Sequence, residues 1–287
     1  MIYLMRRKIL FFILSSLIII PGIIFTLLGG LKFGIDFTGG ALLEYKFEKT
    51  PSLNSLIKYG QVNLTGENTY IIKSKPLEGE RLNQTREEIK KEFGNFEIRR
   101  EENVGPVIGK ELTIKAIWGT LLSCLMIVLY ITYSFRKVPK PASSFRFGVA
   151  AVVALFHDVL VLIGSFAVLG YFFKIEIDTL FVTALLTVIG FSVHDTIVVF
   201  DRIRENMPKH LNLSFSEIAD ISITQTLARS LNTSLTVLIV LFALLLFGGE
   251  TIKYFVLALF IGIASGTYSS IFNATALLCW WEERLGH

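Results

Sequence analysis

Cysteine and charge are both scarce in this chain. Only two of its 287 residues are cysteines, Cys124 and Cys279, and both lie inside apolar runs. A disulfide framework and a cysteine-based metal site are therefore excluded. Charged residues make up 18% of the chain and hydrophobic residues 52%, with a mean hydropathy of +0.59. This composition is too apolar for an average soluble domain and predicts a membrane protein.

The charges that are present are concentrated in one segment. Residues 31–111 hold 13 Lys/Arg and 13 Asp/Glu, which is half of all the charged side chains. The segment is therefore neutral, and the net charge of +4 belongs to the rest of the chain. No contiguous basic patch results, so we expect no nucleic-acid binding. The segment also lacks His and Cys and interleaves acids with bases, so we expect no catalytic or metal site there.

Six windows are long and apolar enough to span a membrane, which takes about 20 residues for roughly 30 Å of hydrocarbon. They lie near residues 9–29, 114–134, 147–170, 179–200, 230–248 and 254–281. Basic residues precede the first window, as in a signal peptide. Its apolar run is too long for one, however, and no small-residue cleavage motif follows, so we expect an uncleaved anchor.

The distribution of basic residues predicts the orientation, because Lys and Arg favour cytoplasmic loops. With the N-terminus inside, three bases lie at outer helix ends: Lys115, Lys174 and Lys253. Twelve lie at inner ends: Arg6, Arg7, Lys8, Arg136, Lys137, Lys140, Arg146, Arg202, Arg204, Lys209, Arg229 and Arg284. We therefore expect the N-terminus and first helix in 1–30, an extracytoplasmic domain in 31–113, five more helices in 114–281 and a cytoplasmic tail in 282–287.

The extracytoplasmic segment has the pattern of a small α+β domain. Residues 41–47, 68–72 and 96–104 are rich in β-branched or aromatic side chains or alternate in hydrophobicity, which predicts strands. Residues 51–59 and 80–93 predict amphipathic helices, the second with Leu82, Ile89 and Phe93 on one face. This order favours a sheet with helices on one face.

Glycine and serine mark three further positions. Gly34, Gly39 and Gly40, which surround Asp36, predict a hinge or tight turn before the first strand, because glycine adopts positive φ without strain. Gly262 and Gly266 form a G-x-x-x-G motif that favours close helix packing. Ser214 and Glu217 match a capping box, which predicts a short interfacial helix running toward Leu227.

The informative side chains are the ionisable ones within the predicted spans, because each costs about 2.5–3.5 kcal/mol near a helix centre. They are His157 and Asp158 in the third span, His194 and Asp195 in the fourth, and Arg229 at the start of the fifth. Asp195 and Arg229 approach one membrane face from consecutive antiparallel helices and could pair. Either they form a structural ion pair, or Asp195 binds and releases a proton as the helices move.

Two neighbouring patterns leave their alternatives open. Thr183, Thr187, Gly190 and His194 form a small and polar stripe beside Asp195, which suits either close helix packing or a water path. His157 and Asp158 are adjacent in sequence and point about 100° apart on a helix, so at most one can face a narrow cavity. A direct proton-transfer role is one interpretation of this pair, and a structural role is the other.

Four segments resemble the SecF family. They are Phe33–Gly40 (FGIDFTGG), Val107–Leu112 (VIGKEL), Ser192–Asn206 (SVHDTIVVFDRIREN) and Gln225–Ser230 (QTLARS), the last followed by Asn232, Thr233 and Ser234. They cover nearly the whole chain in order. By motif position, Asp195 is similar to the proposed proton-carrying aspartate of the family and Arg229 to its partner arginine. The chain departs from the family at His194, where Asn is usual.

The resemblance implies a half of the RND-type transporter fold that pairs with SecD and needs neither cofactor nor metal. It implies an accessory subunit, not an enzyme, of the Sec export machinery in the bacterial cytoplasmic membrane. Its expected partners are SecD, the translocon channel subunits, unfolded preprotein and protons. Protonation of Asp195 would then drive the outer domain through the hinge at Gly34–Gly40. About 2.3 kcal/mol per elementary charge is available for each 100 mV of membrane potential.

Two other functions stay open at this stage. One is a passive assembly factor of the translocon, in which Asp195 and Arg229 are structural. The other is an RND-like half that transports small solutes or lipids, which requires a second six-helix half and a more polar cavity than the sequence indicates.

Overall fold

The computed structural model describes residues 4–77, 79–139 and 142–285. Two compact units divide the chain: Phe33–Trp118, called the α+β domain below, and Met1–Lys32 with Gly119–His287, called the membrane unit. Lys140, one of the predicted inner bases, lies outside the described residues, as do both extremities of the predicted terminal segments.

Within the described residues, six helices are long and apolar enough to cross a membrane, which confirms the predicted number and order. They are α1 (Lys8–Leu27), α5 (Pro106–Ser134), α6 (Ser144–Phe173), α7 (Thr179–Asn206), α8 (Phe215–Phe247), and a last span built from α9 (Lys253–Tyr268), the π-helical turn η5 (Ser269–Asn273) and α10 (Ala274–Arg284). Short 3-10 turns precede α1 (η1, Met5–Arg7), follow α7 (η3, Met207–Lys209) and precede α9 (η4, Glu250–Ile252). Most of these helices are longer than the predicted apolar windows, because they continue into polar residues at their ends.

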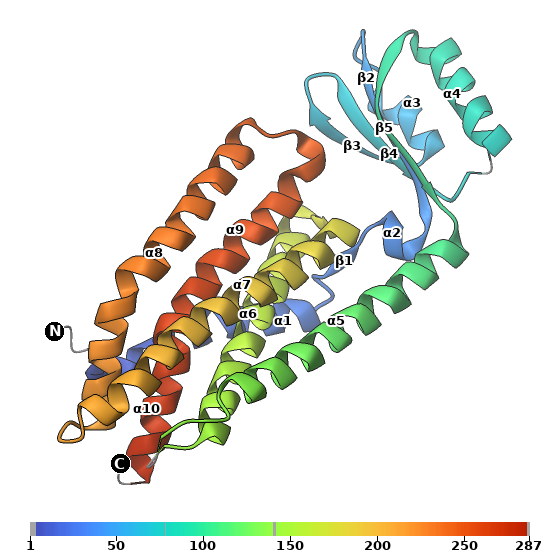
Figure 1. Ribbon diagram of the computed structural model, residues 1–287. Helices are drawn as coiled ribbons and strands as arrows, with labels where there is room; N and C mark the ends of the chain where they lie inside the picture. The colour runs from blue at the N-terminus through green and yellow to red at the C-terminus, as the bar shows by residue number, and fades with distance from the viewer. Residues whose placement is uncertain (1–3, 78, 140–141, 286–287) are drawn as a thin grey trace. The chain divides into compact units, whose positions relative to one another are not determined.

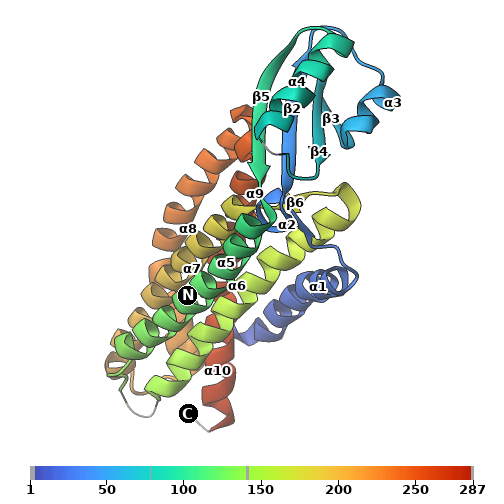
Figure 2. The same cartoon turned by 90° about the vertical axis from the view of Figure 1, so that its right-hand side faces the viewer.

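Helices α6, α7 and α9 form the centre of the membrane unit, and each contacts the other two. Helix α8 packs against α7 and α9, and Figure 1 shows α8 and α9 side by side. Helix α1 packs against α6 (Figure 2). Gly22 and Gly164 make this approach close, since a Cβ on either would lie 2.7 Å from the Cα of the other. The buried polar side chains of the membrane unit therefore come mainly from α6, α7 and the last span.

The prediction of a separate interfacial helix running from Ser214 toward Leu227 is wrong. Its capping box is present, with the Ser214 and Glu217 side chains each bonded to the other residue's backbone N–H. The helix that it starts continues without a break to Phe247. A helix of 33 residues is about 50 Å long, which exceeds the roughly 30 Å of hydrocarbon. The first turns of α8 therefore lie beyond the hydrocarbon, as a continuation of the membrane-spanning part of the same helix.

The α+β domain contains a four-stranded antiparallel sheet of order β3-β4-β2-β5. Its strands are β2 (Gly40–Phe47), β3 (Gln61–Gly66), β4 (Thr69–Ser74) and β5 (Phe96–Val104); its helices are α2 (Ile35–Thr38), α3 (Leu53–Leu56) with the 3-10 turn η2 (Ile57–Tyr59), and α4 (Gly79–Phe93). Two strands of two residues each lie outside this sheet: β1 (Lys32–Phe33), at the boundary of the two units, and β6 (Glu176–Ile177), in the membrane unit. Leu56 of α3 and Ile89 of α4 pack into one core with Tyr45 and Ile72 of the sheet. The prediction of helices on one face is thus confirmed, whereas β3 was missed and the predicted helix at 51–59 is shorter and partly 3-10.

The glycine-rich segment before β2 is a tight turn. Gly39 has φ 73° and Gly40 has φ 149°, so both need glycine, whereas Gly34 has φ −72° and does not. A Cβ on Gly39 would lie 3.1 Å from the Cα of Pro106. The segment belongs to the α+β domain, whose boundary with the membrane unit falls between Lys32 and Phe33. A hinge at Gly34, Asp36, Gly39 and Gly40 stays a prediction.

From the buried phenol of Tyr45 we predict that the α+β domain loses stability at alkaline pH. Its phenol is buried and donates a hydrogen bond to Glu101, which also accepts from Arg86 Nε at 3.0 Å. Burial, and then the Glu101 hydrogen bond, raise the pKa of Tyr45 above its ordinary value of about 10. Because the folded pKa is the higher one, the stabilisation is complete below about pH 10 and is lost as the pH rises further. Tyr45→Phe should remove this loss.

Circular dichroism of the full-length protein in detergent, recorded as the pH is raised from 8 to 12, checks this prediction. Tyr254→Phe is the matched control, because it removes a phenol that is 41% exposed. The control should lose structure at the same pH as the wild type, and Tyr45→Phe at a higher pH. Identical curves for all three proteins would contradict the prediction.

Candidate functional site

Asp195 lies on α7 and points into the membrane unit. The residue is 2% exposed. The Ser234 hydroxyl of α8 donates to Asp195 Oδ2 at 3.4 Å, and the Thr267 hydroxyl of α9 lies 2.7 Å from Ser234 Oγ. His194 Nδ1 lies 3.7 Å from Asp195 Oδ1. These four residues, called the Asp195 cluster, place one carboxylate among neutral hydroxyls, with the titratable His194 at its edge.

The structure does not bring Asp195 and Arg229 together. Arg229 is exposed on α8, and no ion pair links it to Asp195 within the part of the chain that the structure describes. Ser234, which does contact Asp195, is five residues further along α8. Five residues correspond to about 140° around a helix, so the face that presents Ser234 to Asp195 turns Arg229 away. The pairing expected from sequence is therefore not formed in this conformation.

The polar stripe beside Asp195 is exposed along its whole length. Thr183, Thr187, Gly190 and His194 all lie on the outer surface of α7, and a Cβ on Gly190 would meet no atom within 4 Å in the described structure. The stripe therefore does not serve helix packing within this chain. A packing role for Gly190 therefore stays a prediction, which would need a neighbour outside the described chain.

Helix α8 also exposes polar side chains in its membrane-spanning part: Arg229, Asn232, Thr233 and Thr236. Polar groups directed at lipid tails are unfavourable, because hydrocarbon offers them no hydrogen bonds. The exposed polar surfaces of α7 and α8 are thus unlike a surface that faces lipid alone.

The other two glycines predicted for packing are tightly packed. A Cβ on Gly262 would lie 2.3 Å from Val188 Cγ2, and one on Gly266 would lie 3.1 Å from Ser192 Cβ. Both contacts are with α7. The G-x-x-x-G motif therefore sets the close approach of α9 to the helix that carries Asp195.

Asp158 forms a second buried cluster, on α6. Its side chain is fully buried, and Ser192 of α7 and Ser269 of η5 donate hydrogen bonds to its Oδ2, the second at 2.7 Å. Ser265 of α9 donates to Oδ1 at 3.5 Å, and His157 Nδ1 lies 3.0 Å from the same oxygen. These five residues are called the Asp158 cluster. They join three helices of the membrane unit around one carboxylate.

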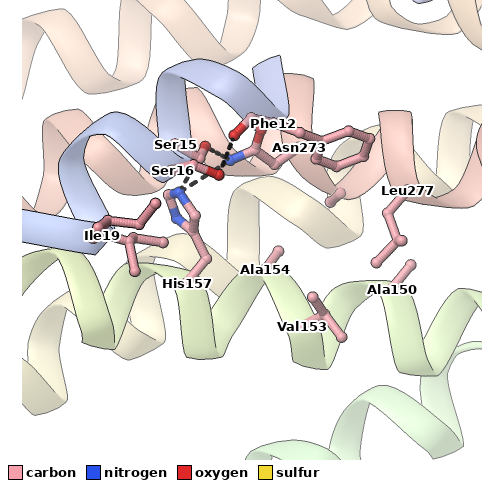
Figure 3. Close-up of a pocket in the computed structure, with 12 residues that line it drawn as sticks. Phe12, Ser15, Ser16, Ile19, Ala150, Val153, Ala154, His157, Asn273 and Leu277 are labelled. Carbon is pink, nitrogen blue, oxygen red and sulfur yellow. Dashed lines mark hydrogen bonds between the residues drawn. The ribbon is translucent and has the colours of Figure 1, made fainter. Parts of the chain in front are cut away.

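His157 and Asp158 point in different directions, as their adjacency predicts. His157 lines a cavity between α1, α6 and α10, together with Ser15 and Asn273, and Asp158 does not (Figure 3). His157 Nε2 lies 2.9 Å from Ser15 Oγ and 3.1 Å from Asn273 Nδ2. The pair therefore connects the cavity to the interior of the membrane unit.

The buried hydroxyls that the last span places in or beside the two clusters were missed from sequence. Ser265, Thr267, Ser269 and Ser270 fall within six positions of the last span, and this density of hydroxyls was the available signal. The π-helical turn η5 begins at Ser269, and both Ser269 and Ser270 are fully buried. Such turns are rare and often mark functional sites. Among the described residues, no group of three or more His, Cys, Asp or Glu side chains is placed to hold a metal ion.

Comparisons with known proteins agree along nearly the whole chain. The family model "Protein export membrane protein SecD/SecF, C-terminal" matches residues 84–284, and the "SecD/SecF GG Motif" model matches residues 24–51. The Protein translocase subunit SecF of Thermobaculum terrenum is 48% identical, over 99% of this chain and 95% of that protein. The SecF subunit of Anaerolinea thermophila is 42% identical over the same shares of the two chains.

A solved structure has the same fold. The crystal structure of SecDF from Thermus thermophilus, described as a translocon-associated membrane protein, superposes with a TM-score of 0.84 at 32% identity. The match covers 98% of this chain and 38% of the SecDF chain. A second SecDF structure, in a super-membrane-facing form, gives a TM-score of 0.68 over the same shares. This chain therefore corresponds to well under half of a SecDF polypeptide.

Proposed function

The chain belongs to the SecD/SecF family of protein-export membrane proteins, and we propose that it is a SecF subunit which, with SecD, uses the proton-motive force to promote preprotein translocation. The observation that carries the proton-driven part is Asp195. It is a buried carboxylate within a membrane-spanning helix, and its nearest partners are the Ser234 hydroxyl, which the Thr267 hydroxyl contacts in turn, and a histidine rather than a fixed cation. Ionisable side chains in such positions mark ion and proton pathways.

The proposed mechanism couples the charge of Asp195 to helix packing. When Asp195 is charged, hydroxyl hydrogen bonds and the approach of a cation stabilise it; when it is neutral, that attraction disappears. Arg229 is the candidate cation, because it lies on the neighbouring helix α8 and is not bound to Asp195 in this conformation. Movement between the two arrangements would be passed to the α+β domain through the segment around Gly34, Gly39 and Gly40. The domain would then act on unfolded preprotein.

The proposed orientation places both termini in the cytoplasm and the α+β domain outside a bacterial cytoplasmic membrane. Its support is the excess of basic residues at one set of helix ends. Arg146 and Arg284 are examples, at the first turn of α6 and the last residue of α10. Cysteine labelling from either side of the membrane tests this orientation directly.

SecD is the partner we propose for the exposed polar surface of α7 and α8. The solved SecDF structure, of which this chain matches 38%, supports a chain that works beside a second membrane half. A protein partner satisfies Thr183, Thr187 and Asn232 with hydrogen bonds that lipid cannot make. Isolation of the tagged chain in mild detergent should therefore recover SecD and the channel subunits. A homodimer without any Sec component would instead favour the small-solute transporter.

Gradient-dependent export tests the proposal as a whole. Membrane vesicles that contain the chain, SecD and the translocon channel should export a model preprotein faster when a proton gradient is imposed, and a protonophore should remove the gain. An unchanged rate in both conditions would favour a passive assembly factor.

His194→Asn should preserve gradient-driven export and at most move its pH profile. The His194 side chain is 71% exposed, and its contact with Asp195 is 3.7 Å long, so it is a neighbour of the carboxylate rather than its main support. The measurement is the export rate of vesicles between about pH 6 and 8, where an ordinary histidine titrates. Loss of export at every pH would show that the histidine is required.

A further inference from the structure

We propose that the cavity between α1, α6 and α10 is a water-filled entry port for protons and that His157 is its accepting group, separate from the Asp195 cluster. The inference rests on the proposed proton-driven function and adds a second proton-binding site to it. Four features of the described residues support it: the cavity, an unpaired acceptor on its wall, the tautomer of His157 and the burial of Asp158 behind it.

The cavity has a volume of about 220 Å³ and is polar at one end only. Ser15 and Ser16 of α1, His157 of α6 and Asn273 of η5 form the polar end, and apolar side chains line the rest (Figure 3). This volume holds several water molecules, and the polar end offers the two to four partners that an ordered water needs.

Asn273 carries the unpaired acceptor. The residue is 7% exposed, and its Oδ1 is buried without a hydrogen-bond partner in the part of the chain that the structure describes. Its Nδ2 donates to Ser15 Oγ at 2.6 Å. Buried amide oxygens almost always have a partner, often a water molecule. A water in the cavity would supply one here, beside His157.

The hydrogen bonds around His157 define its tautomer. The carboxylate of Asp158 can only accept, so His157 Nδ1 carries the hydrogen that lies toward Asp158 Oδ1 at 3.0 Å. Asn273 Nδ2, a donor, faces Nε2 at 3.1 Å, so Nε2 is the basic nitrogen. It is therefore the basic nitrogen, not the N–H, that faces the cavity.

Protonation of His157 requires only a local change. A hydronium ion in the cavity transfers its proton to Nε2 and becomes water, and the imidazolium is held by the carboxylate of Asp158. The new N–H then needs an acceptor in place of the Asn273 amide nitrogen. Rotation of the Asn273 amide presents the unpaired Oδ1 to it. One side chain thus accommodates both protonation states.

Few other titratable groups face this site. Asp158 is the one on α6, and α1 has none between Lys8 and Lys32. The last span contributes Tyr268, whose hydroxyl donates to the Phe11 carbonyl at 2.9 Å, and α7 contributes the neutral Ser192 behind Asp158. Among the described residues of these helices, no basic side chain other than His157 is paired with Asp158. A proton that enters the cavity has His157 as its first acceptor.

Cysteine accessibility tests whether the cavity holds water. In the full chain, expressed with SecD in native membranes and with Cys124 and Cys279 replaced by alanine, Ser16→Cys lies in the cavity. Leu17→Cys, the matched control, adjoins it on α1 at a residue that is 69% exposed and lies outside the cavity lining. A small charged methanethiosulfonate reacts with thiolate in water. We expect it to label Ser16→Cys at least tenfold faster. Equal and slow rates would mean that an acyl chain fills the cavity and would overturn the proposal.

Nitrogen NMR of the histidine-labelled protein in lipid nanodiscs, in the same complex, tests His157 itself. The signal that His157→Gln removes should change from one protonated nitrogen to two as the pH is lowered from about 8 to 5. Ala154→Leu, which fills the cavity and leaves His157 in place, should slow both this change and the labelling of Ser16→Cys. A His157 signal that does not change over this range refutes the proposal. Neither readout involves export, so this inference and the proposed function can fail independently.

Discussion

Replacing Asp195 by asparagine should abolish the stimulation of protein export by a proton gradient and leave the protein inserted in the membrane. Asparagine has nearly the same shape and still accepts a hydrogen bond from Ser234, so the packing of α7 against α8 and α9 should persist. It cannot bind or release a proton. The rate with a gradient should therefore fall to the rate without one.

The measurement is preprotein translocation into inverted membrane vesicles, with and without a protonophore, at matched amounts of the inserted protein. Asp201→Asn is the control, because it makes the same substitution two turns further along α7. Asp201 forms an ion pair with Arg204, and its side chain is 42% exposed, so its charge is solvated. The control should keep full stimulation. Full stimulation in Asp195→Asn would exclude Asp195 as the proton site.

A loss of export could also arise if Asp195→Asn disturbed the packing of the helices. The structure allows this to be checked on the neighbouring hydroxyl. Ser234→Ala removes the 3.4 Å hydrogen bond to Asp195 but leaves its carboxyl group. It should retain gradient-driven export, with an altered pH profile at most. If Ser234→Ala and Asp195→Asn were equally inactive, a structural role for the whole Asp195 cluster would explain both.

The number and order of the membrane-spanning helices were predictable because they depend on the summed hydropathy of windows of the sequence. A run of about 20 apolar residues is long and apolar enough to span a membrane, whatever its partners are. The strands at residues 41–47 and 96–104 were predictable for a similar reason, since their composition is local. Strand β3, with the sequence QVNLTG, alternates polar and apolar residues, but the pattern spans only five positions with two apolar side chains, Val62 and Leu64, and it was missed. It forms a strand because it pairs with β4, and the composition of the segment alone does not specify that pairing.

The positions of Asp158 and Asp195 in their spans were also predictable, but their partners were not. Partners depend on how each helix is rotated about its axis, and apolar runs on all sides of a helix leave that rotation undetermined. The expected pairing of Asp195 with Arg229 is absent from this conformation for this reason, because Ser234 occupies the contact with Asp195. The turn η5 adds a second cause. This π-helical turn, whose Ser269 donates a hydrogen bond to Asp158, has no signature of its own in the sequence.

Gly164→Ala should destabilise the membrane unit, although alanine is the better helix former. The added Cβ would lie 2.7 Å from Gly22 Cα, a backbone atom that cannot rotate away, so α1 and α6 must separate. Overpacking of this kind typically costs about 1–3 kcal/mol. The gain in helix propensity from Gly to Ala is only about 0.5–1 kcal/mol and does not offset it. The net effect is a clear loss of stability.

Gly148→Ala tests the explanation, because it makes the same substitution on the same helix where a Cβ meets no atom within 4 Å of the described structure. The gain in propensity then acts alone, so this variant should be as stable as the wild type or more so. Thermal unfolding in detergent, followed by a thiol-reactive dye, measures both. In a Cys124→Ala background the dye reports on Cys279, which is fully buried in α10 and becomes reactive when the helices separate. Opposite shifts of the two variants would assign the cost to contact between α1 and α6, whereas equal shifts would assign it to the helix itself.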